Sequence, residues 1–444
     1  MGRATTAIWG ERKPHPAVRD RHAAGQPMFA AEVKAVGSRT DSRLRVLMYS
    51  HNGFGLGHLK RTTNIAARFV KEVPTSSVLM LVGSPAGVSF PLPPGVDFVK
   101  VPSIIKLDSG VWRPRSLHIG REMAKALRAS MIQKAAEIFM PNLFLVDYIP
   151  TGVWGELLPT LQMLKEREHP AKVVLGLRDI LDAPDVTREL WRQEDAYEAL
   201  KTYYDCVFIY GCEEIFDTAS QYGLSGALAR KVKYCGYLCS EEACKPNEQM
   251  RDELQIKKDK FIVVTGGGGY DAYPMMRTCM EAFQRLGAAV PYEAIVIAGP
   301  LMEDEQREWL RKQAEGLPVR VLRYAEDHLG FLNAADLVIS MAGYNTLLEA
   351  VRLRKRVLVV PREGPSVEQR IRAEMFSRLG LVHAIPPEEL SPSVLAQAIG
   401  RNLDTRPVPL LPLNMDGLSN VVRDMMRLLQ MDSRALSRRR SHAR

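Results

Sequence analysis

The sequence predicts an α/β protein made of two similar halves, each built around a parallel sheet. Two glycine-rich turns carry this prediction, because each lies between an apolar run and a helical stretch. The first is Gly53–His58 after the run 45–48, and the second is Gly266–Gly269 after the run 261–264. A glycine turn that leads into a helix presents unpaired backbone N–H groups at the positive end of the helix dipole. We therefore expect two anion-binding turns that face each other across a cleft.

Apolar runs and helical stretches alternate in two series along the chain. Continuous runs of Val, Ile and Leu, each followed by a helix, are typical of parallel strands covered on both faces. The first series predicts strands at 44–49, 78–83, 96–101, 143–147, 172–177, 206–210 and 232–235, with helices at 58–72, 118–139, 153–167, 186–202 and 213–222. The second predicts strands at 261–265, 293–298, 319–322, 336–340 and 356–360, with helices at 272–286, 303–314, 343–352, 366–379 and 392–402. The polar stretch 240–258 is expected to be a linker.

The two ends of the chain are expected to lie outside this alternation. Residues 1–43 show no hydrophobic periodicity and are predicted to be a disordered extension. Three prolines in 404–413 exclude a helix there, so this stretch is expected to be a strap that carries a last helix, 414–431, elsewhere. Residues 432–444 form a basic tail. The two domains would then comprise 44–240 and 241–413.

Composition excludes several classes of protein. The chain of 444 residues has 46% hydrophobic residues but no run of eighteen apolar residues, and its start lacks a short apolar segment, so a cytoplasmic location is expected. The net charge of +9 is largely at the ends, where the tail is either solvated or attracted to an anionic membrane surface on the inner face. No basic stripe interleaved with aromatics predicts nucleic-acid binding. Cys235, Cys239 and Cys244 lack the paired spacing of a metal site, and no metal is expected.

Neither glycine turn fits the two best-known nucleotide motifs. The dinucleotide fingerprint requires a third glycine, but His58 and Asp271 stand at that position in the two turns. The strand 78–83 also ends without the acidic residue that would hold a ribose. No Gly-Lys-Ser/Thr follows either turn, which excludes a P-loop. The sequence therefore predicts no NAD, FAD or other cofactor.

A more specific pattern follows the predicted strand 336–340. The helix that begins near Gly343 places Thr346 and Glu349 on one face. A carboxylate at this position can accept hydrogen bonds from both vicinal hydroxyls of a ribose. The next helix opens with Glu368 and Gln369, whose polar groups are suited to reading sugar hydroxyls. The pattern favours a nucleotide sugar as ligand.

These segments carry a family resemblance. The run Gly343-x-x-Thr346-x-x-Glu349, followed by Pro361 and Glu368-Gln369, is similar to GT-B glycosyltransferases, as is the turn that ends in Gly57-His58. The resemblance is to MurG-like enzymes, the bacterial N-acetylglucosaminyltransferases that complete the lipid-linked peptidoglycan precursor, and to predicted glycosyltransferases related to them. Over about 44–430 it implies two Rossmann-like domains facing across a cleft. The N-terminal domain would lie on the acceptor side, the C-terminal domain would bind the nucleotide sugar, and the last helix would cross back to the N-terminal domain.

The resemblance also implies roles for individual residues. The donor diphosphate would meet backbone amides of Gly266, Gly267, Gly268 and Gly269, together with Thr346 and the amide of Gly343 or Tyr344. Glu349 would bind the ribose of the uridine nucleotide, and the segment around Tyr324 and Ala325 would lie beside the uracil. The donor sugar would contact Glu368 and Gln369. The turn with Gly53, Gly55 and Gly57 would face the phosphates from the other domain, with His58 beside the acceptor. Departures from the family pattern at Phe54-Gly55-Leu56 and at Val367 leave the acceptor and the hexosamine open.

Sugar transfer requires a base for the acceptor hydroxyl. We expect His58 to be this base, with Asp147 as the second candidate because it ends a strand where open α/β sheets bind ligands. The alternatives are that His58 caps its own turn, that Asp147 is an ordinary strand-end residue and that Glu349 is solvated. Arg178 and Asp179 form either a surface ion pair or a ligand contact. No Asp-x-Asp motif is found, so helix N-termini and glycine amides are expected to stabilise the leaving group.

The sequence thus predicts an inverting, metal-independent glycosyltransferase. It would move a hexosamine-type sugar from a UDP-sugar to a lipid-linked or polysaccharide acceptor. One alternative is a UDP-sugar hydrolase, because the run Gly55-Leu56-Gly57-His58-x-x-Arg61 resembles that class as well. The other is a non-catalytic subunit that binds a nucleotide sugar for a partner.

Overall fold

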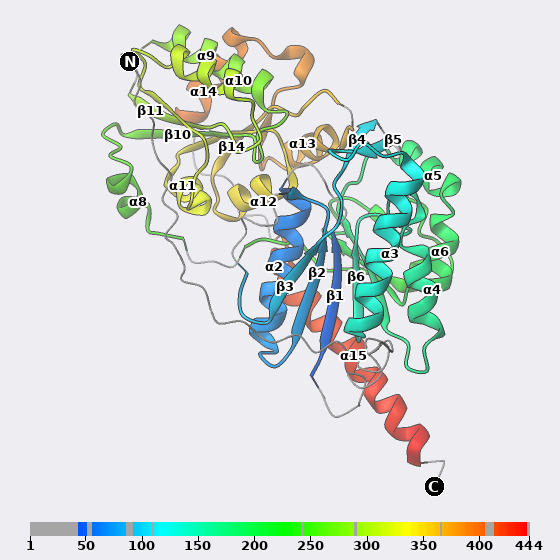
Figure 1. Cartoon of the computed structure of the whole chain (residues 1–444). Coiled ribbons are helices and arrows are strands. Elements are labelled where there is room, and N and C mark those ends of the chain that lie inside the picture. Colours follow the sequence, from blue (N-terminus) through cyan, green and yellow to red (C-terminus); the bar gives the residue numbers. More distant parts are fainter. Residues whose placement is uncertain are drawn as a thin grey trace, which may run out of the picture. The chain divides into compact units, whose positions relative to one another are not determined.

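The computed structural model describes residues 43–50, 56–85, 92–108, 111–240, 244–287, 291–364, 366–404 and 413–441. Two parallel sheets form its framework (Figure 1). We call 43–240 together with the last helix the N-terminal lobe, and 244–404 the C-terminal lobe. Gly53, Gly55, the predicted extension up to residue 42 and most of the predicted strap lie outside the described residues.

The sheet of the N-terminal lobe has the strand order β3-β2-β1-β6-β7-β8-β9. Its strands are β1 (Arg45–Ser50), β2 (Ser77–Val82), β3 (Val96–Lys100), β6 (Leu143–Asp147), β7 (Lys172–Arg178), β8 (Cys206–Tyr210) and β9 (Val232–Tyr234). Its helices are α2 (Gly57–Glu72), α3 (Arg121–Phe139), η2 (Val153–Gly155), α4 (Leu158–Glu166), α5 (Pro184–Gln193), α6 (Ala196–Tyr203), α7 (Thr218–Gln221) and η3 (Ala229–Lys231). The first four strands of this order follow the 3-2-1-4 pattern of Rossmann-like sheets.

The C-terminal lobe repeats this pattern with the order β12-β11-β10-β13-β14-β15. Its strands are β10 (Lys260–Thr265), β11 (Tyr292–Ile297), β12 (Val319–Leu322), β13 (Leu337–Ser340), β14 (Arg356–Val359) and β15 (His383–Ala384). Its helices are α8 (Asn247–Glu253), α9 (Tyr273–Leu286), α10 (Asp304–Gln313), α11 (His328–Ala334), α12 (Tyr344–Arg352), α13 (Glu368–Arg378), η4 (Pro387–Glu389) and α14 (Pro392–Asp404). The prediction of two Rossmann-like sheets is confirmed.

Buried residues alternate between the two faces of each sheet. In the N-terminal lobe, Val46 and Met48 pack with α2, whereas Leu47 and Tyr49 pack with α3, α4 and α6. In the C-terminal lobe, Ile262 and Val264 pack with α9 and α14. Period-two alternation on strands that are buried on both sides explains why the sequence showed continuous apolar runs.

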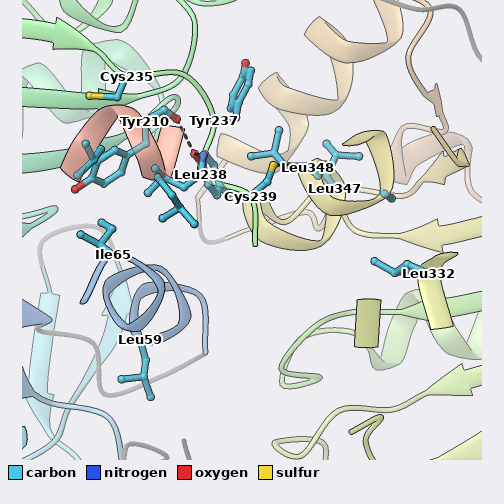
Figure 2. Close-up of a cluster of buried hydrophobic side chains, with 14 of the residues drawn as sticks. Leu59, Ile65, Tyr210, Cys235, Tyr237, Leu238, Cys239, Leu332, Leu347 and Leu348 are labelled. Atoms are coloured by element: carbon cyan, nitrogen blue, oxygen red, sulfur yellow. Dashed lines mark hydrogen bonds between the residues drawn. The ribbon is translucent and has the colours of Figure 1, made fainter. Parts of the chain in front are cut away.

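One cluster of buried side chains contains residues from both lobes (Figure 2). Leu59 and Ile65 of α2 belong to it, and so do Leu347 and Leu348 of α12. The segment 235–239, which follows β9, supplies further members between them. Helix α15 (Gly417–Ser441) packs against α2 and adds its apolar face, which includes Val421 and Met425. The last helix therefore returns to the N-terminal lobe.

Several elements differ from the prediction. The stretch 240–258 contains α8 rather than only a linker, and α8 packs against α11, a helix that was not predicted. A hairpin of β4 (Ile104–Asp108) and β5 (Val111–Pro114) was also missed. Helix α15 continues to Ser441, so much of the predicted basic tail is helical. No helix among the described residues is long and apolar enough to cross a membrane.

Candidate active site

His58 lies in the first turn of α2, where it faces Asp147 at the end of β6. Nδ1 of His58 is 2.5 Å from Oδ2 of Asp147. The guanidinium of Arg61, one turn further along α2, donates to Oδ1 of the same carboxylate from Nε at 3.1 Å and from Nη2 at 2.7 Å. Nη2 of Arg61 also lies 2.8 Å from Nδ1 of His58. The two predicted candidates for the base are thus brought together as one histidine–carboxylate pair, which Arg61 holds in place.

Burial and charge set the protonation of this pair. Burial lowers the pKa of His58 to about 4, although Asp147 acts in the opposite direction. Burial alone would raise the pKa of Asp147, but Arg61 and His58 outweigh it and hold that pKa well below its usual value. Near pH 7 the imidazole is therefore neutral and the carboxylate is ionised. This is the state in which a histidine can accept a proton.

Tyr148 and Arg178 extend the pair toward the C-terminal lobe. The ring of Tyr148 meets the ring of His58 edge-on at a centroid distance of 5.4 Å. Arg178, the last residue of β7, places its guanidinium 5.5 Å from the centroid of Tyr148. Tyr148 has a φ of 77°, which a non-glycine residue rarely adopts, directly after Asp147. Such strain is concentrated at functional sites.

The glycine loop of the C-terminal lobe connects β10 to α9. Gly267 and Gly269 both have positive φ. The loop is fixed by the turn after β11, because Leu301 N–H donates to the carbonyl of Gly268 at 2.9 Å. A Cβ added to Gly269 would lie 2.1 Å from the carbonyl oxygen of Ala298. Only glycine therefore allows this close approach of two backbones.

This loop and the first turns of α2 and α12 lie close together. A Cβ placed on Gly267 would lie 3.8 Å from Oγ1 of Thr346, in the first turn of α12. Nδ2 of Asn345 donates to the carbonyl of Gly57, the first residue of α2, at 3.2 Å. Neither α2 nor α12 has an acidic residue in its first turn, so the positive ends of both helix dipoles lack an acidic partner from their own helix. Two such N-termini beside a glycine loop form an environment suited to an anion.

Glu349 is buried, with its side chain only 3% exposed. Its Oε1 accepts a hydrogen bond from Nζ of Lys60, on α2, at 2.7 Å. Its Oε2 approaches Nδ1 of His328 at 3.4 Å but has no hydrogen-bond partner, and neither ring nitrogen of His328 has one. Burial would raise the pKa of Glu349, but His328 and Lys60 together hold it below its usual value. Glu349 is thus an ionised, buried carboxylate with one oxygen that is unsatisfied, and it is not a solvated surface residue.

Glu368 and Gln369 lie at the start of α13, in a network with Arg362. Nη2 of Arg362 donates to Oε1 of Glu368 at 2.5 Å, and Nη1 donates to Oδ2 of Asp271 at 2.8 Å. The side-chain oxygen of Gln369 accepts from the backbone N–H of Arg362 at 3.2 Å. Nη1 of Arg178 from the other lobe approaches Glu368 at 4.0 Å. A contact of Glu368 and Gln369 with a donor sugar remains a prediction.

A second group of residues ties the two lobes together. The fully buried Arg372 of α13 donates to both carboxylate oxygens of Asp179, which follows β7, at 3.0 and 2.7 Å. Asp179 is therefore not the surface residue that one reading of the sequence suggested. The hydroxyl of Tyr344 donates to the carbonyl of Tyr210 at 2.8 Å and accepts from the N–H of Leu238 at 3.0 Å.

The structure places the other predicted residues as follows. Tyr324 is exposed and Ala325 is half-buried, just before α11, and their place beside a uracil remains a prediction.

Gly266 packs against Ala272, and a Cβ added to Gly343 would meet nothing within 4 Å. Cys235 and Cys239 are buried thiols. Within the described ranges, no group of three or more His, Cys, Asp or Glu side chains is placed to hold a metal ion.

Sequence reasoning assigned no role in this site to three of its polar residues, Lys60, Arg61 and His328, although Arg61 stands in the run that resembles hydrolases. The spacing of Arg61 could have indicated its role, since it lies one helical turn after His58 and so on the same helix face. For His328 the sequence offers only the preceding Asp327, which caps α11 by accepting a hydrogen bond from Gly330 N–H. No local pattern indicates a role for Lys60, because its partner Glu349 is 289 residues away.

Comparison with known proteins supports the resemblance that the motifs suggested. Residues 261–411 match the model of the glycosyltransferase family 28 C-terminal domain. An uncharacterized glycosyltransferase of Methanopyrus kandleri is 32% identical over 173 residues, which are 39% of this chain and 46% of that protein. The UDP-N-acetylglucosamine–N-acetylmuramyl-(pentapeptide) pyrophosphoryl-undecaprenol N-acetylglucosamine transferase of Rubrobacter xylanophilus is 26% identical over 149 residues, 33% of this chain and 41% of that enzyme. The chain thus spans less than half the length of these curated relatives.

Solved structures of glycosyltransferases share the fold over most of the chain. MurG of Acinetobacter baumannii superimposes with a TM-score of 0.53 and 15% identity, over 87% of this chain and 99% of MurG. The glycotransferase of kitacinnamycin gives a TM-score of 0.55 at 14% identity, over 89% and 99% of the two chains. The chain therefore has the GT-B fold, it resembles MurG and related glycosyltransferases, and its residues 261–411 are similar to the glycosyltransferase family 28 C-terminal domain.

Proposed function

We propose that the protein is an inverting glycosyltransferase that moves a hexosamine-type sugar from a UDP-sugar to a lipid-linked or polysaccharide acceptor without a metal ion. The observation that carries this proposal is the meeting of α2 and α12. Gly57, next to the His58–Asp147 pair, contacts Asn345 at the N-terminus of the helix that bears Glu349. This contact supports a single site that holds both the proposed base and the predicted nucleotide-binding residues.

In the proposed reaction, the acceptor hydroxyl attacks the anomeric carbon of the donor sugar. Its proton passes to Nε2 of His58, while Nδ1 faces Asp147, whose ionised carboxylate orients the ring and stabilises the imidazolium. The bond from the anomeric carbon to the β-phosphate oxygen breaks, and UDP leaves with the electron pair. Attack from the face opposite to UDP inverts the anomeric centre.

The leaving UDP gains negative charge as this bond breaks. Backbone amides of the loop Gly266–Gly269 and the N-termini of α12 and α2 would receive this charge. Preorganised dipoles of this kind stabilise developing charge without reorganising during the reaction. Glu349 would accept hydrogen bonds from the ribose, for which its unsatisfied Oε2 is suited.

The lipid-linked acceptor is proposed because of what one relative is named for. The Rubrobacter enzyme is named for transfer to a pyrophosphoryl-undecaprenol acceptor, which motivates a lipid-linked acceptor and peripheral contact with an anionic membrane for this chain. The arginine-rich stretch 438–440, within the helical end of α15, is the segment expected to make that contact.

The test is to incubate the purified protein with UDP-N-acetylglucosamine, with and without a lipid-linked or polysaccharide acceptor, and to follow UDP and free sugar. Acceptor-dependent release of UDP with an inverted product supports the proposal. Release of free sugar without any acceptor would indicate a hydrolase instead. Binding of the nucleotide sugar with no turnover under any acceptor would indicate a non-catalytic subunit.

A further inference from the structure

Lys60 forms an ion pair between the lobes at the residue predicted to bind ribose. Its ammonium lies 2.7 Å from Oε1 of Glu349, and its side chain is 29% exposed, whereas that of Glu349 is 3% exposed. Lys60 lies two residues after His58 on α2. The pair thus links the helix that carries the proposed base to the helix that carries the proposed ribose ligand.

This ion pair and a bidentate ribose contact compete for one oxygen of Glu349. A ribose that uses both carboxylate oxygens would place a hydroxyl on Oε1, which already accepts from Lys60, whereas Oε2 has no hydrogen-bond partner. The carboxylate is buried on α12 and the Lys60 side chain is 29% exposed, so Lys60 is the partner that can move away. Lysine has a flexible four-carbon stem and an ammonium that is satisfied by any nearby anion.

The anion available after this movement is the diphosphate. Thr346 precedes Glu349 by three residues, so the two side chains are neighbours on one face of α12, roughly 5–6 Å apart. Thr346 also lies beside the glycine loop at Gly267. The ammonium of Lys60, at Glu349, therefore lies near the part of α12 that the proposed function assigns to the phosphates.

We propose that Lys60 is a donor-binding residue that leaves Glu349 when a uridine nucleotide binds and then contacts its diphosphate. This inference rests on the proposed function, because it uses the same nucleotide site. Lys60 would select for ligands that bring their own negative charge. A nucleoside without phosphates would have to displace Lys60 and leave the ammonium without an anion, whereas UDP would supply one. As UDP departs, the same ammonium would stabilise its developing charge.

The test is a calorimetric titration of UDP and of uridine into wild-type protein and the variants Lys60→Met and Lys60→Gln. In both variants the affinity for UDP should fall by roughly 10- to 100-fold, the scale of losing a charged hydrogen bond. The affinity for uridine should stay unchanged or rise, because Met makes no hydrogen bond to Glu349 and the neutral amide of Gln binds this carboxylate more weakly than the ammonium does. Lys60→Arg, which keeps the charge, should retain most of the affinity for UDP.

Two comparisons keep this test decisive. Lys71→Met removes the same charge from the far, exposed end of α2 and should change neither affinity. Lys60→Gln can still donate a hydrogen bond to Glu349, so it serves if Lys60→Met does not fold. Equal losses for UDP and uridine would show that Lys60 is only a structural tie between the lobes, and an unchanged UDP affinity would also overturn the proposal. Wild-type protein that binds neither ligand would instead overturn the proposed function, and this inference with it.

Discussion

Nδ1 of His58 and Oδ2 of Asp147 lie 2.5 Å apart, although the two residues are 89 positions apart in the chain. The pair forms because α2 and β6 both present their site residues at the same edge of the parallel sheet, where β1 and β6 are neighbours. A carboxylate beside one ring nitrogen fixes the orientation of the imidazole and leaves the other nitrogen to act on substrate.

Replacing His58 should impair turnover far more than donor binding. His58→Ala removes the base that takes the acceptor proton, so turnover should fall by roughly 10²- to 10⁴-fold. The affinity for UDP should stay nearly the same, because the proposed nucleotide contacts come from the C-terminal lobe, from Lys60 and from backbone amides at the start of α2, and not from the His58 side chain. Steady-state kinetics and a UDP titration on the same preparation measure both quantities. Unchanged turnover would remove His58 from the mechanism.

The pH dependence of the reaction should report the lowered pKa of His58. The base is active when neutral, and burial lowers its pKa to about 4 from an ordinary value near 6.5. Protonation therefore sets in only as the pH falls toward 4, and kcat/KM should stay nearly constant between pH 7 and pH 5. The profile is measured with saturating donor and limiting acceptor, with thermal melts at each pH as the control. An acidic limb centred near pH 6.5 would contradict the buried state of His58.

The sequence predicted the sheets well because their strands are buried on both faces. The runs at β1, β6 and β10 consist largely of Val, Ile, Leu, Phe and Met, and these side chains are buried. The hairpin β4–β5 was missed because Leu107 and Val111 are exposed there and its strands mix apolar with basic residues. Helix α11 was missed because it has only seven residues, although Asp327 caps it.

The site was predictable only where one segment carries its own pattern. His58 and Glu349 each stand at a fixed spacing from a glycine at a helix start, and this spacing is what predicted a role for both. Partners were not predictable, because pairing depends on distances that the fold sets. Asp179 was paired with its neighbour Arg178 in one reading of the sequence, but its partner is Arg372, 193 residues away.

The buried pair of Arg372 and Asp179 should matter for stability. Arg372→Met leaves the carboxylate of Asp179 buried without its cation, which should cost about 3–5 kcal/mol of the free energy of unfolding. Arg370→Met, two residues away, breaks an exposed pair with Glu388 and should cost less than about 1 kcal/mol. Urea unfolding measures the free energy of unfolding of wild type, Arg372→Met and Arg370→Met. Adding Asp179→Asn to Arg372→Met should recover part of the loss, and equal effects of the two single arginine variants would contradict this account.

The glycine loop should tolerate no side chain at Gly269. Gly269→Ala would combine an unfavourable positive φ with a clash against the carbonyl of Ala298, so the free energy of unfolding should fall by at least about 3 kcal/mol. Gly380 also has a positive φ, 69°, but a Cβ there meets nothing within 4 Å. Gly380→Ala should therefore cost only about 1–2 kcal/mol. A smaller loss for Gly269→Ala than for Gly380→Ala would mean that the loop is not held against the turn after β11.

The central claim is that a uridine nucleotide binds at the N-terminus of α12, with its ribose on the buried carboxylate of Glu349. Its most direct test is a calorimetric titration of UDP into wild-type protein and into Glu349→Ala, with Glu374→Ala, an exposed carboxylate of α13, as the control. We predict that Glu349→Ala weakens binding by about 1–3 kcal/mol and that Glu374→Ala has no effect. Equal UDP affinity in wild type and Glu349→Ala would contradict the claim and place the ribose elsewhere.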